Sequence, residues 1–348
     1  MNSKTVITKE TKNKIHVDYE GKLSFKERLK KKFQSSNTWI KGIVSVLKFV
    51  LMLGVSYVIL YPFFSKIAGS FMGKLDVIDP TVSLIPKHFT LDIYKYIVLD
   101  NHYFKAFFNT LLLSLICALI QTFIACLIGY GLAKFKFKGN KLVMIAVVVT
   151  MIIPHNTLKI AMSHRFLHFD LFGLKMFNNN GMLTWLFGQI ELTDTMWPFV
   201  IFSIGGIAFK NGLYIYMMRQ FFKGVPDELE ESAYVDGANT FRTFLQIILP
   251  LSVPMMITIF IFSFSWQWTD QFYITLFSSG LEDRSIWTMV NVVNTETSLK
   301  DAAFAGNDLY MDIVKDTAGI MVIFPLVIMY LFCQKYIVQG IERSGITG

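Results

Sequence analysis

The sequence predicts an all-α membrane protein with six transmembrane helices and a polar hairpin between two of them. Apolar residues make up 53% of the 348 positions and phenylalanine alone occurs 33 times, a balance that ordinary soluble domains do not show. Six apolar stretches have the roughly 20 residues that a helix needs to cross about 30 Å of hydrocarbon. An acidic, glycine-containing segment at residues 227–250 separates two of these stretches.

The predicted spans together define a transmembrane domain over residues 43–348, preceded by a basic segment at residues 1–42. A helix is expected for each span, because a helix satisfies its own backbone hydrogen bonds in a medium that offers none. The expected spans are residues 43–67, 107–133, 142–162, 196–221, 251–276 and 317–336.

Basic residues predict the orientation of the spans, since Lys and Arg beside a span are retained in the cytoplasm. Residues 1–42 contain eleven Lys or Arg, and the second connection contains Lys134, Lys136, Lys138 and Lys141. Both segments are therefore expected to lie in the cytoplasm. With six spans, the C-terminus and the 227–250 hairpin are then expected on the same side. The protein is expected to be a multi-pass membrane protein with both termini in the cytoplasm.

The N-terminal segment has the pattern of a basic interfacial helix that contacts membrane lipid. Phe25, Leu29 and Phe33 recur every fourth residue among lysines, which places them on one helical face. A disordered charged tail is the alternative, and residues 1–20 are expected to lack regular structure on either interpretation. This segment accounts for most of the net charge of +8, so no nucleic-acid partner is needed to explain it.

Residues 227–250 read as helix, glycine turn and helix. Asp227 can cap the first helix, with Glu230 three residues later closing a capping box. Gly237 can end that helix in a left-handed conformation, and Asn239 or Thr240 can cap the next. Small residues near the turn would let another surface approach closely, while apolar residues anchor the underside; the small set is Ser232, Ala233, Gly237 and Ala238, and the apolar set Leu229, Phe241, Phe244 and Ile247.

The spacing within this hairpin resembles the signature loop of ABC importer membrane subunits. In that family Glu-Ala-Ala, Gly and Ile-x-Leu-Pro stand at the intervals occupied here by Glu231-Ser-Ala, Gly237 and Ile247-x-Leu249-Pro250, with Ser232 in place of an alanine. The resemblance implies that the loop is a coupling helix, which sits in a cleft of an ATPase subunit. The residues expected to couple to the ATPase are Glu230, Glu231, Ser232, Ala233, Asp236, Gly237, Ala238, Ile247, Leu249 and Pro250.

The resemblance extends over residues 105–348 and is closest to the carbohydrate-uptake branch, including the second permease of the maltose transporter. It rests on segments such as Phe108-Asn-Thr-Leu, Tyr130-Gly-Leu-Ala-Lys-Phe-Lys-Phe-Lys-Gly139 and Met218-Arg-Gln-Phe-Phe222. It implies a type I importer permease fold, a homologous second permease subunit, two ATPase subunits that bind ATP and Mg, and an extracytoplasmic solute-binding protein. Transport would proceed by alternating access.

Polar residues within two spans are candidates for the translocation path, since such groups usually face a cavity or a partner at membrane depth. Aromatic faces with fixed hydrogen-bonding groups suit sugars, although interhelical polar contacts and interfacial tryptophans are alternatives. Pro154 is expected to break or kink the outer end of the third span. The candidate path residues are Lys210, Asn211, Trp266, Gln267, Trp268 and Asp270.

Other chemistries find little support in the sequence. No phosphate-binding G-x-x-x-x-G-K-[ST] motif or catalytic set occurs, so the chain is expected to be a non-catalytic transport subunit without a cofactor or metal of its own. His164 and His168 have a metal-compatible spacing but no third ligand, and the three cysteines fall within predicted spans. A permease for peptides or other polar solutes remains an alternative, as does an ion-coupled carrier, which the lack of a second inverted half disfavours.

Overall fold

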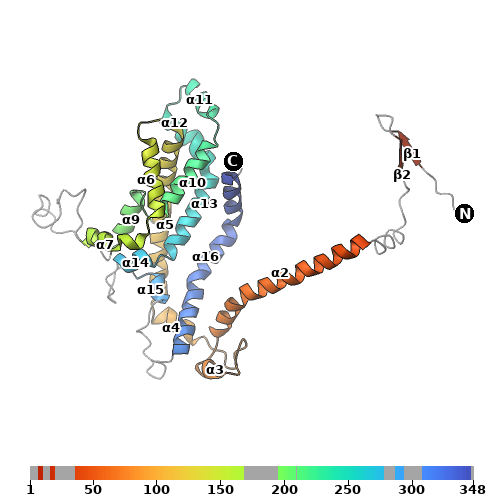
Figure 1. Cartoon of the computed structure of the whole chain (residues 1–348). Coiled ribbons are helices and arrows are strands. Elements are labelled where there is room, and N and C mark those ends of the chain that lie inside the picture. The colour runs from red at the N-terminus through yellow and green to blue at the C-terminus, as the bar shows by residue number, and fades with distance from the viewer. Residues whose placement is uncertain are drawn as a thin grey trace, which may run out of the picture. The chain divides into compact units, whose positions relative to one another are not determined.

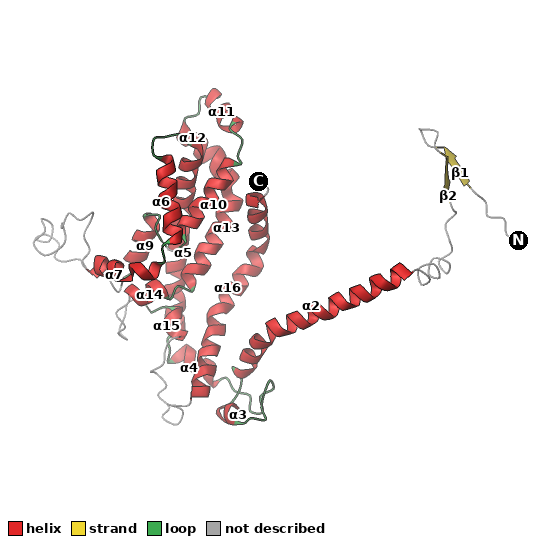
Figure 2. Cartoon of the chain, in the orientation of Figure 1, coloured by secondary structure: helices red, strands yellow, loops and turns green. Residues whose placement is uncertain are grey.

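The computed structural model describes residues 7–10, 16–19, 36–167, 195–208, 210–277, 287–293 and 308–345. The chain divides into two compact units, residues 1–65 and 66–348. Helices dominate the described part of the chain, as Figure 2 shows by colour, and the predicted all-α membrane class is confirmed.

The first unit contains a short hairpin that the sequence did not predict. Strand β1 (Ile7–Glu10) pairs antiparallel with β2 (His16–Tyr19), with Ile7 opposite Tyr19. The expectation that residues 1–20 lack regular structure was therefore wrong for these two strands, because they contain β-branched and aromatic residues such as Ile7, Val17 and Tyr19, which favour a strand despite the charged surroundings. The expected interfacial helix over residues 25–33 lies outside the described residues.

Three of the predicted spans are single long helices. Helix α2 (Ser36–Gly69) contains the span at 43–67, α5 (Tyr103–Lys134) contains 107–133, and α16 (Asp308–Gly345) contains 317–336. Helix α16 extends beyond its apolar stretch into the polar residues at both ends. Within the second unit α5 is central and packs against α9, α10 and α13, as Figure 1 shows.

The fifth span begins and ends earlier than predicted. The helical run Thr240–Trp268 is continuous and comprises α12 (Thr240–Thr243), the π-helical turn η2 (Phe244–Ile248) and α13 (Leu249–Trp268). It does not reach residue 276. The Asp270 carboxylate accepts a hydrogen bond from the Tyr273 N–H at 3.1 Å and so begins a separate helix, α14 (Phe272–Phe277).

The third predicted span is broken rather than straight. Helix α6 (Asn140–Ile152) is followed by η1 (His155–Leu158) and α7 (Lys159–Leu167), and the segments bend by 94°. Ile153 and Pro154 are extended at the break, because proline disfavours helical geometry in the residue before it. The predicted break at Pro154 is confirmed, and the segment predicted as the third span can cross a membrane only as a bent pair of helices.

The fourth predicted span, 196–221, was also wrong as a single helix. Helix α9 (Trp197–Ile204) ends before Gly206, and α10 (Asn211–Lys223) begins after Lys210. Both residues have left-handed backbones, with φ of 69° and 65°, which a continuous right-handed helix cannot contain. In the described part of the chain four helices are long and apolar enough to cross a membrane, or five if the bent pair at Pro154 counts as one span.

The end of the second unit farthest from α11 and α12 contains several short helices (Figure 1). Helices α3 (Lys74–Ile78), α4 (Asp92–Leu99) and α15 (Met289–Val293) surround the ends of α5 and α16. The Met289 N–H donates to the Thr110 hydroxyl at 2.9 Å, which fixes the start of α15 on α5.

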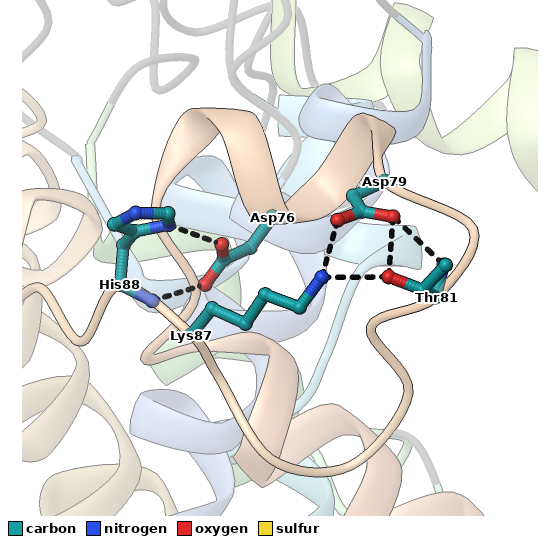
Figure 3. A network of polar contacts seen from close by, with 5 residues as sticks. All are labelled: Asp76, Asp79, Thr81, Lys87 and His88. Carbon is teal, nitrogen blue, oxygen red and sulfur yellow. Dashed lines mark hydrogen bonds and ion pairs between the residues drawn. The ribbon is translucent and has the colours of Figure 1, made fainter.

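Two carboxylates organise the loop between α3 and α4, as Figure 3 shows. Buried Asp76 accepts hydrogen bonds from the backbone N–H of His88 and contacts its Nδ1, both at 2.7 Å. Asp79 pairs with Lys87 at 2.7 Å and also accepts from Thr81. The Lys87 ammonium, followed by Thr81, holds the pKa of the Asp79 carboxyl well below its usual range.

Helices α5 and α10 approach closely at one glycine. A Cβ added to Gly129 would lie 2.5 Å from the Met218 Cβ and 3.0 Å from the Arg219 nitrogen. A Cβ at Gly131, on the same helix, would have no atom within 4 Å. Only the first glycine is therefore required for helix packing, in the way that small residues allow close contact between membrane helices.

The Gly129→Ala substitution should lower the stability of the second unit by about 1–3 kcal/mol, because the added methyl overpacks the α5–α10 contact. Gly131→Ala is the matched control and should be neutral or stabilising, since alanine favours a helix over glycine by up to about 1 kcal/mol. Thermal unfolding of both variants in detergent measures the difference. Equal melting temperatures for the two variants would contradict this packing.

Candidate functional site

The first candidate site is the hairpin of α11 (Glu228–Val235) and α12 at one end of the bundle (Figure 1). Its first helix does not begin with the predicted capping box. Asp227 has a helical backbone and makes no side-chain cap, so that detail of the prediction was wrong. The carboxylate instead pairs with Lys134, the last residue of α5.

Lys134 fastens the beginning of α11 to the end of α5. Its ammonium donates to the Val225 carbonyl at 2.7 Å, pairs with Asp227, and lies 3.6 Å from the Glu230 carboxylate. The Lys134 and Glu230 side chains are only 8% and 11% exposed, so this contact is screened less than a surface ion pair. The hydrogen bond from Lys134 holds the pKa of Asp227 below its usual value.

Tyr130 reinforces the same junction one turn earlier on α5. Its buried hydroxyl donates to the second oxygen of the Glu230 carboxylate at 3.3 Å. The Tyr130 ring also packs against Phe222 of α10 and Phe244 of η2. Helices α5 and α10 and the π-helical turn η2 therefore meet at the Tyr130 ring, next to the hairpin.

The turn of the hairpin has the predicted geometry. Gly237 has φ of 81°, the left-handed conformation that ends α11, and the Ala238 N–H donates back to the Ala233 carbonyl at 2.9 Å. The Asn239 side chain accepts from the Arg242 N–H at 2.8 Å and caps α12. The predictions of a glycine stop and an Asn239 cap are confirmed.

The hairpin has a distinct outward surface. The predicted coupling residues Glu231, Ser232, Asp236 and Gly237 are exposed, Ala238 is half-buried, and Val235 at the end of α11 is 88% exposed. Glu230 and Ala233, also predicted as coupling residues, point inward and are buried. We call the exposed set from Glu231 to Gly237 the hairpin tip.

The underside of the hairpin differs in part from the expectation. Phe244 is buried and Ile247 packs against the core as predicted. Leu229 and Phe241 are exposed, and buried Thr243 and Ile248 take their place. Leu249 packs against the same core, while Pro250 is exposed in the first turn of α13. The π-helical turn shifts the register of side chains here, which a sequence pattern with the α-helical period does not anticipate.

The second candidate site is a cavity of about 420 Å³ at the break between α6 and α7. It lies where the two broken spans meet, since residues around Pro154 and around Lys210 both line it. The residues that line it are Thr150, Met151, Ile152, Ile153, Pro154, His155, Asn156, Ile207, Ala208, Lys210, Gly212, Leu213 and Phe272.

Lys210 and Trp266 meet beside this cavity. The Lys210 ammonium lies 5.0 Å from the centre of the Trp266 ring, a cation–π distance. His155, which also lines the cavity, makes a 2.8 Å hydrogen bond between its Nδ1 and the Tyr273 hydroxyl. The cavity therefore brings together groups from three segments that are far apart in the sequence.

Of the predicted path residues, Lys210 is among those that line the cavity, and Asn211, Trp266, Gln267, Trp268 and Asp270 are not. Asn211 is fully buried against α5, and neither of its amide atoms has a hydrogen-bond partner among the described residues. Trp268 is 1% exposed and donates to the Val322 carbonyl at 2.9 Å, so it is a core residue of the α13–α16 contact. Gln267 contacts Asp270 at 3.5 Å near the start of α14.

Sequence reasoning missed several residues of both sites. In the sequence, Lys134 indicates only which side of the membrane its connection faces. Tyr130 contributes only to the segment that resembles the importer family. Met151 to Pro154 supplied a signal for the cavity, because a proline break in an apolar span exposes backbone groups. Phe272 and Tyr273 carried no signal, since they belong to a helix that the fifth span was expected to absorb.

Metal binding finds no site in the described residues. No group of three or more His, Cys, Asp or Glu side chains lies close enough to hold an ion there. His168, the second histidine of the metal-compatible pair, lies outside the described residues. Cys117 and Cys126 are buried as free thiols within α5, and Cys333 is half-buried.

Comparison with known proteins identifies the family. Residues 121–343 match the family described as "Binding-protein-dependent transport system inner membrane component". The chain belongs to this family. Protein LplC of Bacillus subtilis is 26% identical over 319 residues, which cover 90% of this chain and 97% of that protein. The matched region contains both candidate sites.

Other similar proteins share nearly the full length. The arabinooligosaccharides transport system permease protein AraQ of Bacillus subtilis is 25% identical, covering 88% of this chain and 96% of AraQ. The maltodextrin transport system permease protein MalD of Streptococcus pneumoniae is 28% identical, covering 88% and 97%. The solved structure of a bacterial ABC transporter involved in the import of alginate has a TM-score of 0.65 at 23% identity, covering 87% of this chain and 98% of that one. It shows that the fold is that of an ABC importer permease.

Lys134→Met should loosen α11, because the substitution leaves the Glu230 carboxylate buried without its cation. The free energy of local opening of residues 228–235 should fall by roughly 1–3 kcal/mol, measured by hydrogen exchange of the purified protein. Lys138→Met is the control, since this lysine is exposed on the same connection. Unchanged protection of α11 in the Lys134 variant would show that the junction does not depend on this residue.

Proposed function

We propose that the chain is the membrane-spanning permease subunit of an ABC importer for carbohydrate. The family description supports the role in binding-protein-dependent transport. Relatives that are similar over almost their whole length are named for arabinooligosaccharides and maltodextrin, which supports an oligosaccharide cargo over peptides or other polar solutes. A carrier that works alone finds no comparable support.

The observation that carries this proposal is the hairpin, which has a fastened base and an exposed tip. Lys134 and Tyr130 fix Glu230 at the base, while Glu231, Ser232 and Asp236 face outward. A rigid polar element that projects from a membrane bundle can transmit a push from a soluble partner to the helices behind it. We assign this role to the tip and the partner to an ATPase subunit that binds ATP and Mg.

The complete importer would contain four further components. They are a homologous second permease, two ATPase subunits and an extracytoplasmic solute-binding protein. The contact of Lys134 with Asp227 places the lysine-rich connection and the hairpin at the same end of the bundle, which supports the proposal that both face the cytoplasm. The C-terminal end of α16 would lie on the same side.

The cavity would belong to the translocation path. Closure of the ATPases would move the hairpin, and the junction at Tyr130 would pass this movement to α5, α10 and η2 together. Helix α10 runs between the two sites, since its first turn lines the cavity and its last residues contact Tyr130. This helix would therefore couple ATPase closure to the shape of the cavity.

Glu231→Arg should weaken binding of the ATPase subunits, because it reverses a charge on the exposed tip without touching the buried junction. We expect at least about a tenfold loss of affinity, about 1.4 kcal/mol, and loss of transport-stimulated ATP hydrolysis in the co-purified complex. Asp312→Arg is the control, an exposed charge reversal near the start of α16 at the opposite end of the bundle.

Gly237→Pro tests the same element through its backbone, since proline cannot adopt the left-handed φ of this position. It should reduce ATPase binding while the bundle retains its melting temperature. If the complex and its stimulated ATP hydrolysis survive both tip substitutions, the hairpin is not the coupling element.

A further inference from the structure

The loop between α3 and α4 has exposed apolar side chains at its tip. We call residues 82–86 the loop tip; Ile85 is 82% exposed there, and Leu84 is exposed beside it. On α3, Leu75 and Ile78 are exposed three residues apart, which places them on one face of the helix. Exposed apolar residues that are grouped within one short segment, rather than scattered singly, indicate an interaction surface.

Polar contacts close the base of the loop tip, as Figure 3 shows. The Lys87 ammonium donates to the Asp79 carboxylate at 2.7 Å and to the Thr81 hydroxyl at 2.6 Å. The Thr81 N–H and hydroxyl both donate to the other oxygen of Asp79, at 2.9 Å and 2.7 Å. A network of this kind holds its members more firmly than a single surface ion pair does. The tip is therefore shaped before it meets a partner, which reduces the entropy lost on binding.

A second set of contacts attaches the loop to the bundle. Phe71 and Phe89 stack with their ring centroids 5.2 Å apart, and the Gly73 N–H donates to the His88 carbonyl at 3.0 Å. Val77 of α3 packs against a core cluster that includes residues of α4, α5 and α16. Helix α3 therefore lies beside the start of α16, as Figure 1 shows.

The loop begins at the depth of the membrane surface. Asp316 precedes the apolar stretch 317–336 of α16 and pairs with Lys66, in the last turn of α2, at 2.6 Å. Ile313 lies three residues before Asp316, or about 4.5 Å of helix farther out, and a Cβ added to Gly69 would lie 3.9 Å from Ile313. Because the headgroup layer adds about 5–8 Å on each side of the hydrocarbon, the start of the loop segment lies within this layer.

The charges of this segment are balanced. Residues 70–91 contain two lysines and two aspartates, with no arginine or glutamate. Asp76 contacts His88 and Asp79 pairs with Lys87, both at 2.7 Å. A partner protein that recognised the segment by its charge would therefore meet no excess of either sign. A lipid surface needs only apolar side chains beside satisfied polar groups, so these observations favour lipid over a protein partner.

From the depth, the exposed apolar residues and the balanced charge we infer that the loop tip inserts into the bilayer leaflet at the end of the bundle opposite the hairpin tip. Leu84 and Ile85 lie among the acyl chains next to the headgroups, and the Lys87 ammonium stays at headgroup level, since lysine keeps its charged end in the polar layer. The insertion anchors the ends of α2 and α16 in the bilayer while the hairpin end moves. The anchor is independent of the cargo and of the ATPase, and so goes beyond the proposed function.

Quenching of a fluorescent label tests this insertion. Ile85→Cys is labelled with the fluorophore NBD in a Cys333→Ser background, since Cys117 and Cys126 are buried. The labelled chain is reconstituted into phosphatidylcholine vesicles, alone and with the subunits that co-purify with it, and without the solute-binding protein. A nitroxide near the headgroup end of the phosphatidylcholine acyl chain quenches a label that is in the lipid, and iodide on both sides of the vesicle quenches one that is in water.

The same label at Lys95→Cys is the matched control, because Lys95 is exposed on α4 beside Asp92 at the same end of the bundle. The ratio of lipid to iodide quenching should be at least about tenfold higher at position 85 than at position 95, because a tenfold difference corresponds to only about 1.4 kcal/mol. Burial of one large apolar side chain such as Leu84, which remains in place, stabilises the inserted tip by at least as much.

Either of two results would overturn the inference and leave the proposed function intact. One is a ratio at position 85 no higher than at position 95; if the added solute-binding protein then shields the label from iodide, the tip is a docking surface for that protein. The other is protection of position 85 from both quenchers in the assembled importer, which would place the tip against the second permease. Failure of any subunit to co-purify would count against the proposed function instead, and lipid quenching of the chain alone would still test the tip.

Discussion

The arrangement at the hairpin end depends on one lysine at the end of a long apolar helix. Lys134 is the last residue of α5, and its ammonium contacts a backbone carbonyl and two carboxylates of the segment that begins α11. Without it the Glu230 carboxylate would be buried beside an aromatic ring with only the Tyr130 hydroxyl as a partner, an expensive position for a charge. The lysine therefore converts a connection between two helices into an element with a fixed orientation.

Backbone breaks determine the rest of the second unit. Pro154, Gly206 and Lys210 each interrupt a stretch whose composition would support a continuous helix. Pro154 and Lys210 line one cavity, and Gly206 directly precedes a third lining residue, Ile207. Irregular backbone at membrane depth is tolerated where it lines a cavity or is covered by protein. The same breaks place the first turn of α10 in the cavity and its last turn at the Tyr130 junction. A single helix of 13 residues therefore joins the two sites.

Much of this organisation can be predicted from the sequence, and the remainder fails for identifiable reasons. The apolar run 107–133 predicts α5, because a long apolar composition is enough to indicate a membrane-spanning helix. Gly237 and Asn239 predict the turn, because a glycine stop and a helix cap depend only on neighbouring residues. The prediction of one helix over 196–221 is wrong because the hydropathy of a segment does not reveal that Lys210 adopts a left-handed backbone conformation. Trp268 and Trp266 look alike in sequence, yet one is core and the other is half-exposed, since burial depends on α16, more than 40 residues away. The partnership of Lys134 with Glu230 spans 96 positions and leaves no local signal.

The central claim is that the hairpin tip contacts an ATPase subunit, and site-specific cross-linking tests it most directly. A photoreactive residue at Val235, which is 88% exposed at the tip, is irradiated in native membranes, with Leu75 on α3, 71% exposed at the opposite end, as the reference position. We predict a covalent product with an ATPase subunit from position 235, with a yield that changes when ATP is added, and none from position 75. A product between the ATPase and position 75, or between position 235 and the external binding protein, would contradict the account.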